Sequence, residues 1–329
     1  MAKKNAQSDN DDVNEVNDNV YTLKDLPSVG DATLKKLQSA GITSIRSLAM
    51  IPLSKLMDDA GIGEKTALKI IKVAQDIEKM GFKSGQEIWE KRKGLKKLTS
   101  GSQKLDDLLG GGIETGALTE VFGEYRTGKT QIAHQLCVNV QLPHEQGGLE
   151  GAALYIDSEG TFRPERIIQM SEDKDLDYRE ILNNITVGRA YNSDHQMLLV
   201  KEAPKIIEEN NIKFMVIDSI ISHFRSEYTG MGTLAPRQQK INTHIHDLLR
   251  LTEIYELAII FTNQVSARPD VFYGNPIIHT GGHIVAHGAT IRIFLRKGKG
   301  EQRIAKVVDA PHLPEQDTVF SIKDGGITD

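Results

Sequence analysis

The glycine spacing in residues 121–130, VFGEYRTGKT, constrains the fold of this chain more than any other feature. It fits the pattern G-x-x-x-x-G-K-[ST], in which a strand ends in a tight turn and a helix follows. Residues 116–122 indicate that strand, and residues 129–140 indicate an amphipathic helix with Ile132, Leu136, Cys137 and Val140 on one side. A bare match can arise by chance, but here the strand and the helix are both in place. The segment therefore predicts a phosphate-binding loop rather than an ordinary glycine-rich turn.

Such a loop gathers backbone N–H groups at a helix N-terminus, where the helix dipole favours anions. Lys129 can then reach the β- and γ-phosphates of a nucleotide, and the Thr130 hydroxyl can bind Mg²⁺. A second strand, 214–217, is four apolar residues followed by Asp218, which would hold the hydration shell of that ion. We therefore predict a site for ATP and Mg²⁺. The loop residues expected at the nucleotide are Gly123, Glu124, Tyr125, Arg126, Thr127, Gly128, Lys129, Thr130 and Gln131.

The overall composition suits a core domain with a smaller domain attached. The 329 residues are 39% hydrophobic and 26% charged, as in ordinary globular proteins. A single cysteine, Cys137, excludes an internal disulfide framework and fits a reducing cytosol. No apolar run approaches the ~18 residues of a membrane span, and no secretory signal is expected. The net charge is −5, of which the first 19 residues carry −3, so any DNA contact must come from local basic segments.

Four stretches of different character predict the domain organisation. Residues 1–19 form an acidic tail with little to bury, which we expect to be disordered. Residues 20–80 indicate short amphipathic helices punctuated by glycine, and residues 81–98 indicate a charged linker. Residues 99–329 predict an α/β nucleotide-binding core, because strands and helices alternate there.

Two segments of the small domain, 26–37 and 60–71, echo each other as a tight turn leading into a helix. They resemble helix-hairpin-helix motifs, whose turn amides hold a DNA phosphate without reading sequence. In the second segment Gly61, Gly63 and Lys65 are the expected DNA contacts. The alternative is a small helical bundle whose glycines only make tight turns.

The linker carries two aromatic residues, Phe82 and Trp89, that a solvated segment does not need. Either they fold back on their own core, or they enter a pocket of a neighbouring molecule.

Eight strands are expected in the core, at 116–122, 152–157, 184–189, 214–217, 257–263, 290–296, 303–309 and 318–322. The first five are short apolar runs separated by helices, which indicates a mostly parallel sheet covered on both faces. The last three have tight connections and indicate an antiparallel extension.

Polar residues that follow the parallel strands are the candidates for chemistry, because ligands of open α/β sheets bind beyond the carboxyl ends. Asp157 and Glu159 follow one strand, and either carboxylate could orient or deprotonate the water that attacks the γ-phosphate. Gln264 follows another strand and could sense that phosphate, although a loop-capping amide is the alternative.

Two long glycine-rich segments, 224–237 and 265–282, lack clear periodicity and follow the strands that end near Asp218 and Gln264. Loops of this length in a compact core usually bind something. Their arginines, Arg225 and Arg237 in the first and Arg268 in the second, suit phosphate backbones. The alternative for both is a mobile surface segment.

Taken together, these motifs resemble the archaeal RadA recombinases of the RecA superfamily. The resemblance covers the chain from about Tyr21 to the end. It is carried by residues 105–116, by the phosphate-binding loop through Gln131, and by residues 159–166, 281–287 and 295–298. It implies a RecA-like P-loop ATPase core with a mostly parallel sheet, plus a small all-α helix-hairpin-helix domain. It also implies ATP-dependent homologous pairing and strand exchange by a filament on single-stranded DNA.

The resemblance assigns roles to individual residues. Glu159 is then the catalytic carboxylate, Arg166 stacks on the adenine, and Gln264 links the γ-phosphate to the second DNA loop with His287 in the relay. ATP would lie between protomers, capped in trans by residues 309–314, and Phe82 would insert into the adjacent core domain. The two glycine-rich segments would be the DNA loops, and the DNA contacts carried over by the match are Arg225, Arg237, Arg268, Gly281 and Gly282. The cap residues carried over, expected at the nucleotide, are Asp309 and Pro314.

The expected partners are single- and double-stranded DNA and further copies of the chain, with recombination mediators as further candidates and no membrane. The expected location is cytoplasmic and nucleoid-associated. Met231 stands where relatives often have arginine, which puts one DNA contact of the first loop in doubt. Two other functions remain open: a regulatory ATP-binding adaptor of another recombinase, and a ring-forming helicase of the same superfamily.

Overall fold

A computed structural model describes residues 21–267, 277–279 and 282–329 of the chain. The described chain forms two compact units, one over residues 21–40 and 44–80 and one over residues 41–43 and 81–329. Arg268 and Gly281, two of the predicted DNA contacts, lie outside the described residues.

The smaller unit consists of short helices, and glycine sets three of their ends. Its elements are η1 (Leu23–Asp25), α1 (Asp31–Ser39), α2 (Ile45–Met50), α3 (Leu53–Ala60) and α4 (Glu64–Ile77). Gly30 is the N-cap of α1 and Gly63 is the N-cap of α4, so both echoing segments do place a glycine directly before a helix. Gly61 ends α3 in the left-handed region, with φ of 58°, a conformation that favours glycine. Leu37, Leu48 and Ile70 are among the residues that fill the core of this unit.

The larger unit is built on one long mixed sheet. Its strands run in the order β12-β11-β10-β9-β3-β7-β6-β4-β5, and β8 pairs with β7. The strand bounds are β3 (Ala117–Gly123), β4 (Ala152–Asp157), β5 (Ile185–Arg189), β6 (Ile212–Asp218), β7 (Ala258–Ala267), β8 (Ile277–His279), β9 (Ile291–Lys297), β10 (Gln302–Asp309), β11 (Asp317–Lys323) and β12 (Gly326–Thr328). A separate pair, β1 (Lys97–Leu98) and β2 (Ile113–Glu114), precedes β3.

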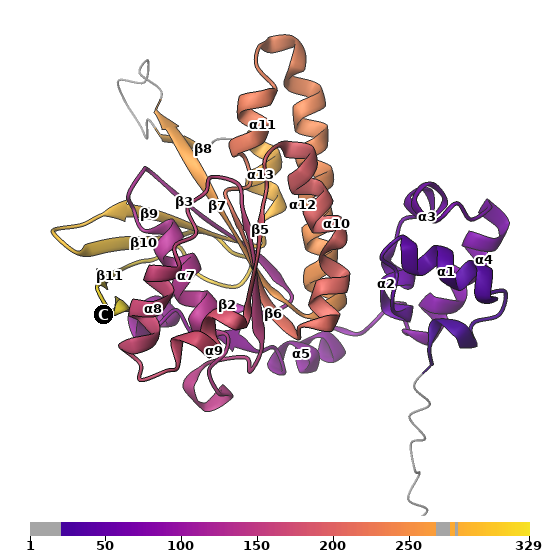
Figure 1. Ribbon diagram of the computed structural model, residues 1–329, viewed down its shortest axis with the longest axis horizontal. Helices are drawn as coiled ribbons and strands as arrows, with labels where there is room; N and C mark the ends of the chain where they lie inside the picture. The colour runs from indigo at the N-terminus through magenta and orange to yellow at the C-terminus, as the bar shows by residue number, and fades with distance from the viewer. Residues whose placement is uncertain (1–20, 268–276, 280–281) are drawn as a thin grey trace, which may run out of the picture. The chain divides into compact units, whose positions relative to one another are not determined.

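Helices cover the sheet on both faces (Figure 1). One face carries α7 (Lys129–Asn139), α8 (Pro164–Glu172) and α9 (Tyr178–Asn183). The other carries α10 (Ser193–Glu209), α11 (Ser222–Glu227), α12 (Leu234–Tyr255) and α13 (Gly282–Gly288). The strands alternate between the two cores: Ile260 of β7 packs in the first and Ile259 in the second. This two-sided burial explains why the central strands are continuous apolar runs.

The expected parallel sheet is confirmed for the first five strands, but the expectation for the last three is wrong in one respect. Strand β9 pairs parallel with β3, and the antiparallel part begins only at β10. The reason is that α13 lies between β7 and β9 and carries the chain back across the sheet, as a parallel connection requires.

Two helices also differ from the sequence-based expectation. Helix α7 is not amphipathic, because all its residues from Ile132 to Asn139 are buried between the sheet and its neighbours. The charged linker contains a helix, α5 (Gly85–Lys93), whose start is fixed by a capping box. There the Ser84 hydroxyl accepts the Glu87 N–H at 3.2 Å and the Glu87 carboxylate accepts the Ser84 N–H at 2.7 Å. The remaining elements of the unit are α6 (Gln103–Leu108), η2 (His144–Gln146) and η3 (Met231–Thr233).

Candidate active site

The parallel strands deliver the predicted polar residues to one edge of the sheet. Gly123 at the end of β3 lies opposite Gln264 of β7, and Asp157 at the end of β4 lies opposite Asp218 of β6. Four segments that are distant in sequence therefore meet at the carboxyl ends of neighbouring strands, where ligands of open α/β sheets bind.

The loop after β3 owes its shape to two glycines. An ideal Cβ on Gly123 would stand 2.2 Å from the Leu295 carbonyl oxygen of β9, so no larger residue fits. Gly128, the N-cap of α7, has φ of 105°, and an ideal Cβ there would stand 2.4 Å from Ile322. Between them the Thr127 hydroxyl donates to the Glu124 carbonyl at 2.9 Å and closes the turn. The side chains of Glu124, Tyr125 and Arg126 are exposed.

Lys129 lies across this loop as the first residue of α7. Its ammonium donates to the carbonyls of Gly123 at 3.0 Å and Glu124 at 2.9 Å. Burial lowers its pKa, while the nearby carboxylates of Asp218 and Glu159 oppose that change. A cation that is partly removed from water gains more from a phosphate than one that is fully solvated.

Four hydroxyl groups donate hydrogen bonds to the Asp218 carboxylate. Its Oδ2 atom accepts from Thr130 at 2.8 Å, Tyr155 at 2.8 Å and Thr161 at 3.2 Å. Its Oδ1 atom accepts from the Thr262 hydroxyl. Because these hydroxyls come from α7, β4, the loop after β4 and β7, one buried carboxylate joins four parts of the site.

The donors at this position suit Mg²⁺. Thr130 and Asp218 offer a hydroxyl and a carboxylate oxygen, the hard ligands that Mg²⁺ prefers, and Mg²⁺ usually keeps several waters and takes only one or two protein ligands beside phosphates. These two residues are the ones that would hold the ion next to a triphosphate on Lys129.

The two carboxylates after β4 have different environments. Asp157 is buried, and its Oδ1 atom accepts the backbone N–H groups of Glu159 at 3.1 Å, Gly160 at 2.7 Å and Thr161 at 3.1 Å. Its Oδ2 atom accepts the Phe162 N–H at 3.2 Å. Four backbone N–H groups, together with the Arg189 guanidinium 3.3 Å from Oδ1, thus commit the Asp157 carboxylate to shaping the loop.

Glu159 instead points its carboxylate toward the neighbouring strand ends. Its Oε1 atom accepts from the Gln264 amide at 3.1 Å and from the Ser219 hydroxyl at 2.9 Å. The geometry therefore favours Glu159 over Asp157 as the carboxylate that acts on water, a choice that the residues alone left open. It also brings Gln264 into direct contact with that carboxylate.

A buried ion pair that the sequence did not reveal, Glu120 with Arg292, is connected to Gln264 through the Asn263 side chain. The Asn263 side chain accepts the Gln264 N–H at 2.9 Å and donates to Glu120 of β3 at 2.8 Å. Glu120 in turn accepts from Arg292 of β9 at 2.6 Å. Burial raises the pKa of Glu120, while Arg292 opposes that change. The only signal in the sequence was a charge inside each of two apolar strands, which need partners when buried.

His134 is a second residue that sequence reasoning missed. Its Nδ1 atom lies 2.6 Å from the Thr130 carbonyl, and its Nε2 atom accepts the Arg163 N–H at 3.0 Å. Its ring stacks on Phe162, and burial lowers its pKa, so the neutral imidazole is favoured. It therefore ties α7 to the segment between Glu159 and Arg166. The spacing of four residues after Thr130 on a buried helix was the available clue.

Arg166, expected at the adenine, lies on α8 at the other end of the site. Its Nε atom donates to Gln131 at 2.6 Å, and its Nη2 atom donates to the Lys323 carbonyl at 2.5 Å. The structure thus brings together Gln131 and Arg166, both expected at the nucleotide, and holds the guanidinium against the β11–β12 turn.

The predicted cap, residues 309–314, begins at the end of β10 on the opposite edge of the sheet. Strand β10 runs antiparallel to β9, and β9 runs parallel to β3, so the carboxyl end of β10 lies beside the amino ends of the parallel strands. Asp309 pairs with Arg292, which pairs with Glu120, three residues before Gly123. Asp309 and Pro314 are exposed and lie away from the phosphate-binding loop of their own chain.

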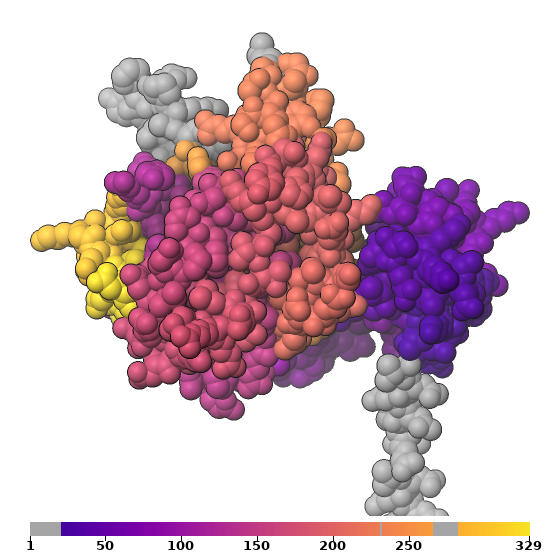
Figure 2. Space-filling view, in the orientation of Figure 1, coloured from indigo at the N-terminus to yellow at the C-terminus, as the bar shows by residue number. Residues whose placement is uncertain are grey.

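The first predicted DNA loop is shorter than expected. Residues 224–237 are not irregular throughout, because α11 continues to Glu227 and α12 begins at Leu234. Pro236 is compatible with this early start, since the first turn of a helix needs no N–H there. Arg225 is exposed on α11 and Arg237 lies in the first turn of α12. Figure 2 shows this segment, in orange, projecting beyond its surroundings in the larger unit.

The second predicted DNA loop is partly regular at its two ends. Strand β7 extends to Ala267, and β8 pairs with it antiparallel. Gly282 begins α13, and His287 lies on the same helix with its ring stacked on His283 at 5.9 Å. Both histidines line a cavity of about 330 Å³ between α12 and α13. The contact of His287 with Gln264 stays a prediction.

The remaining predicted contacts are exposed. Gly61 and Gly63 lie on the turn between α3 and α4, Lys65 lies in the first turn of α4, and Phe82 is fully exposed ahead of α5. Neither Phe82 nor Trp89 is buried against its own core, so that alternative is wrong. Insertion of Phe82 into a neighbouring molecule stays a prediction.

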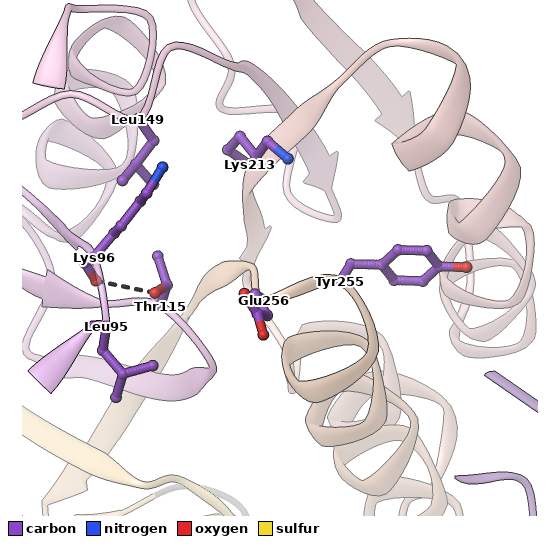
Figure 3. A pocket seen from close by; sticks show the side chains of 8 residues that line it. Leu95, Lys96, Thr115, Leu149, Lys213, Tyr255 and Glu256 are labelled. Carbon is purple, nitrogen blue, oxygen red and sulfur yellow. Dashed lines mark hydrogen bonds between the residues drawn. The ribbon is translucent and has the colours of Figure 1, made fainter. Parts of the chain in front are cut away.

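A further cavity of about 150 Å³ lies at the amino ends of β3, β6 and β7 (Figure 3). Lys96, Lys213 and Tyr255 line it, and the Thr115 hydroxyl donates to the Lys96 carbonyl at 3.0 Å. None of the residues predicted for the site lines this cavity.

Comparison with known proteins agrees with this geometry. Residues 91–329 match the family model described as Rad51. The chain belongs to the Rad51 family. Residues 20–76 match a second model, described as a SAM-like helix-hairpin-helix tandem. The resemblance inferred from the motifs and the expected fold, a RecA-like α/β core with a small helical domain, are both confirmed.

Two curated relatives align over nearly the whole of this Rad51-family chain. A protein of Metallosphaera sedula named DNA repair and recombination protein RadA is 54% identical over 311 residues, 94% of this chain and 96% of the relative. A protein of Aeropyrum pernix with the same name is 48% identical over 310 residues, 94% of this chain and 97% of the relative. In the part of the chain that the structure describes, no helix combines the length and apolar character needed to cross a bilayer.

Proposed function

We propose that this chain is an ATP-dependent homologous recombinase. It assembles as a filament on single-stranded DNA and catalyses homologous pairing and strand exchange in DNA repair. The observation that carries the proposal is the cluster of Lys129, Thr130, Asp218, Glu159 and Gln264 at one edge of the sheet, in a Rad51-family fold. The names of the two RadA relatives support the same role.

In the proposed reaction each group of the site has one task. The loop amides and Lys129 would bind the phosphates of ATP, and Thr130 and Asp218 would hold Mg²⁺, which when bound would supply positive charge beside the transferred phosphoryl group. Glu159 orients a water molecule and receives its proton. Gln264 donates to Glu159, and its strand continues directly into the second predicted DNA loop. Loss of the γ-phosphate would then change the position of Gln264 and of that loop.

The location of the cap supports a shared site. Residues 309–314 lie at the edge of the sheet opposite the phosphate-binding loop, so they can cover only the nucleotide of another copy. Repeated head-to-tail contacts of this kind generate filaments when the rotation does not close a ring. The exposed Phe82 supplies a second contact for the same assembly.

DNA binding in this proposal is made through the backbone. The contacts come from Arg225 and Arg237, from the turn between α3 and α4, and from the second glycine-rich segment. Because these groups address phosphates, binding should weaken steeply with salt and depend little on sequence.

The test is joint-molecule formation between single-stranded DNA and homologous or heterologous duplex, with ATP and Mg²⁺. We expect joint molecules only with the homologous duplex, and none from the Lys129→Ala or Phe82→Glu variants. Lys104→Ala, an exposed lysine outside the site, serves as the matched control and should behave as the wild type. ATP binding without pairing would indicate the regulatory adaptor, and unwinding that ignores homology would indicate the ring helicase.

A further inference from the structure

One buried carboxylate, Glu114, connects two segments to which the proposed function gives separate tasks. The Arg92 Nη2 atom donates to both of its oxygens, to Oε1 at 3.1 Å and to Oε2 at 3.2 Å. The His312 Nε2 atom lies 3.5 Å from Oε2. The Glu114 side chain is 6% exposed, whereas those of Arg92 and His312 are 42% and 35% exposed. A buried carboxylate is thus held by two surface groups from different parts of the chain.

Arg92 is in the last turn of α5, the helix that directly follows Phe82. The helix is nine residues long and buries none of them, so packing does not fix its position. Its capping box orders its start, and Arg92 attaches its end to β2. The direction in which Phe82 is presented therefore depends on the contact between Arg92 and Glu114.

His312 lies in the segment that follows β10, the proposed cap. Leu313 packs against the apolar core of the larger unit, while Asp309, Pro311 and Pro314 are exposed. Ala310 and Leu313 thus attach the segment to the core, and His312 provides a second attachment beside Glu114. The second attachment sets how the exposed residues are presented to a neighbouring molecule.

We infer that Glu114 is a positioning residue that couples the Phe82 plug to the trans cap, through Arg92 on one side and His312 on the other. The inference rests on the proposed function, and it adds that one neighbouring copy receives both segments. Because Arg92 and His312 share one carboxylate, insertion of the plug holds the cap in its closing position over the ATP of that neighbour. Loss of either contact leaves the other on a carboxylate whose orientation is no longer fixed.

The experiment measures release of a fluorescent, non-hydrolysable ATP analogue from filaments on single-stranded DNA. Arg92→Met and His312→Asn should each accelerate release about fivefold, equivalent to ~1 kcal/mol at about 1.4 kcal/mol per factor of ten. The double variant should also release about fivefold faster, since both substitutions interrupt one bridge. A double variant that releases about 25-fold faster would show two independent contacts and overturn the coupling.

Two controls separate this inference from the proposed function. Lys93→Met removes a charge from the same helix end, where Lys93 pairs with Glu90 and lies over the Trp89 ring, and should leave release unchanged. In the Phe82→Glu background no cap reaches a neighbour, so Arg92→Met and His312→Asn should have no effect there. An effect in that background would mean that they disturb their own nucleotide site, and the inference would fail.

The wild type distinguishes the remaining outcomes. If wild-type filaments release the analogue no more slowly than the Phe82→Glu protein, the shared site itself is wrong and the coupling falls with it. If they release it more slowly but both bridge variants match the wild type, the shared site stands and only the role of Glu114 is refuted.

Discussion

The two carboxylates after β4 should respond in opposite ways to removal of their charge. Glu159→Gln keeps the shape of the side chain and an oxygen that can accept from Ser219 and Gln264. Folding should therefore be unaffected, and nucleotide should still bind. The loss should appear in the hydrolysis step, where a positioned general base contributes about 10²- to 10⁴-fold.

Asp157→Asn should show the reverse pattern. The Asp157 carboxylate accepts four backbone N–H groups, and an amide at that position turns its NH₂ group toward at least one of them. One buried N–H then faces a donor, and the three remaining bonds lose their charge assistance. We expect the free energy of unfolding to fall by about 2–4 kcal/mol. ATP turnover should fall only because the loop after β4, which carries Glu159, becomes less ordered.

Single-turnover ATP hydrolysis with Mg²⁺ and single-stranded DNA, combined with urea unfolding of the same samples, measures both effects. The reasoning is refuted if Glu159→Gln hydrolyses ATP within a few-fold of the wild type. It is equally refuted if Asp157→Asn keeps its full stability while losing hydrolysis by more than about 100-fold, since the roles would then be exchanged.

Three further predictions follow from buried groups. His244 is fully buried with a pKa lowered to about 4. Its pKa in the unfolded chain is about 6.5, so between pH 6.5 and pH 4 only the unfolded chain takes up this proton. The free energy of unfolding should therefore drop by up to ~3 kcal/mol over that range. Urea unfolding at several pH values should show a smaller drop for His244→Asn. Gly123→Ala should abolish binding of a fluorescent ATP analogue, because its Cβ would collide with the Leu295 carbonyl, and unimpaired binding would contradict the loop geometry. Arg292→Met should cost about 3–5 kcal/mol of stability by leaving Glu120 buried without its cation, and a calorimetric melting temperature equal to that of the wild type would exclude this role.

Local patterns gave the parts of the site that depend on one segment. The loop glycines, Lys129 and Thr130 are fixed by one strand, one turn and one helix, all visible in ten residues. Asp218 was visible because it ends an apolar strand. The capping box at Ser84 and Glu87 was equally visible and would have predicted α5.

Pairings across the sheet could not be read from the chain. The choice between Asp157 and Glu159 depends on which carboxylate binds the backbone of its own loop and which faces the ends of the neighbouring strands. The hydrogen-bond donors to Asp218 come from four separate segments. The direction of β9 depends on how α13 crosses the sheet, which short apolar runs do not encode. The ion pair between Glu120 and Arg292 joins residues 172 positions apart, and only the strand register makes them neighbours.

The antiparallel return of β10 has a consequence for the ends of any assembly in which the cap works between copies. With the cap acting between copies as proposed, a solitary molecule could not seal its own ATP, and enclosure of the triphosphate would report the presence of a second subunit. In a linear array, the subunit at one end would have an ATP site that no cap covers. The subunit at the other end would have a cap segment with no neighbouring ATP site to cover. The two tips are therefore chemically different, and exchange of spent ADP would begin at a single tip, which gives growth and shrinkage a direction before any DNA polarity is considered.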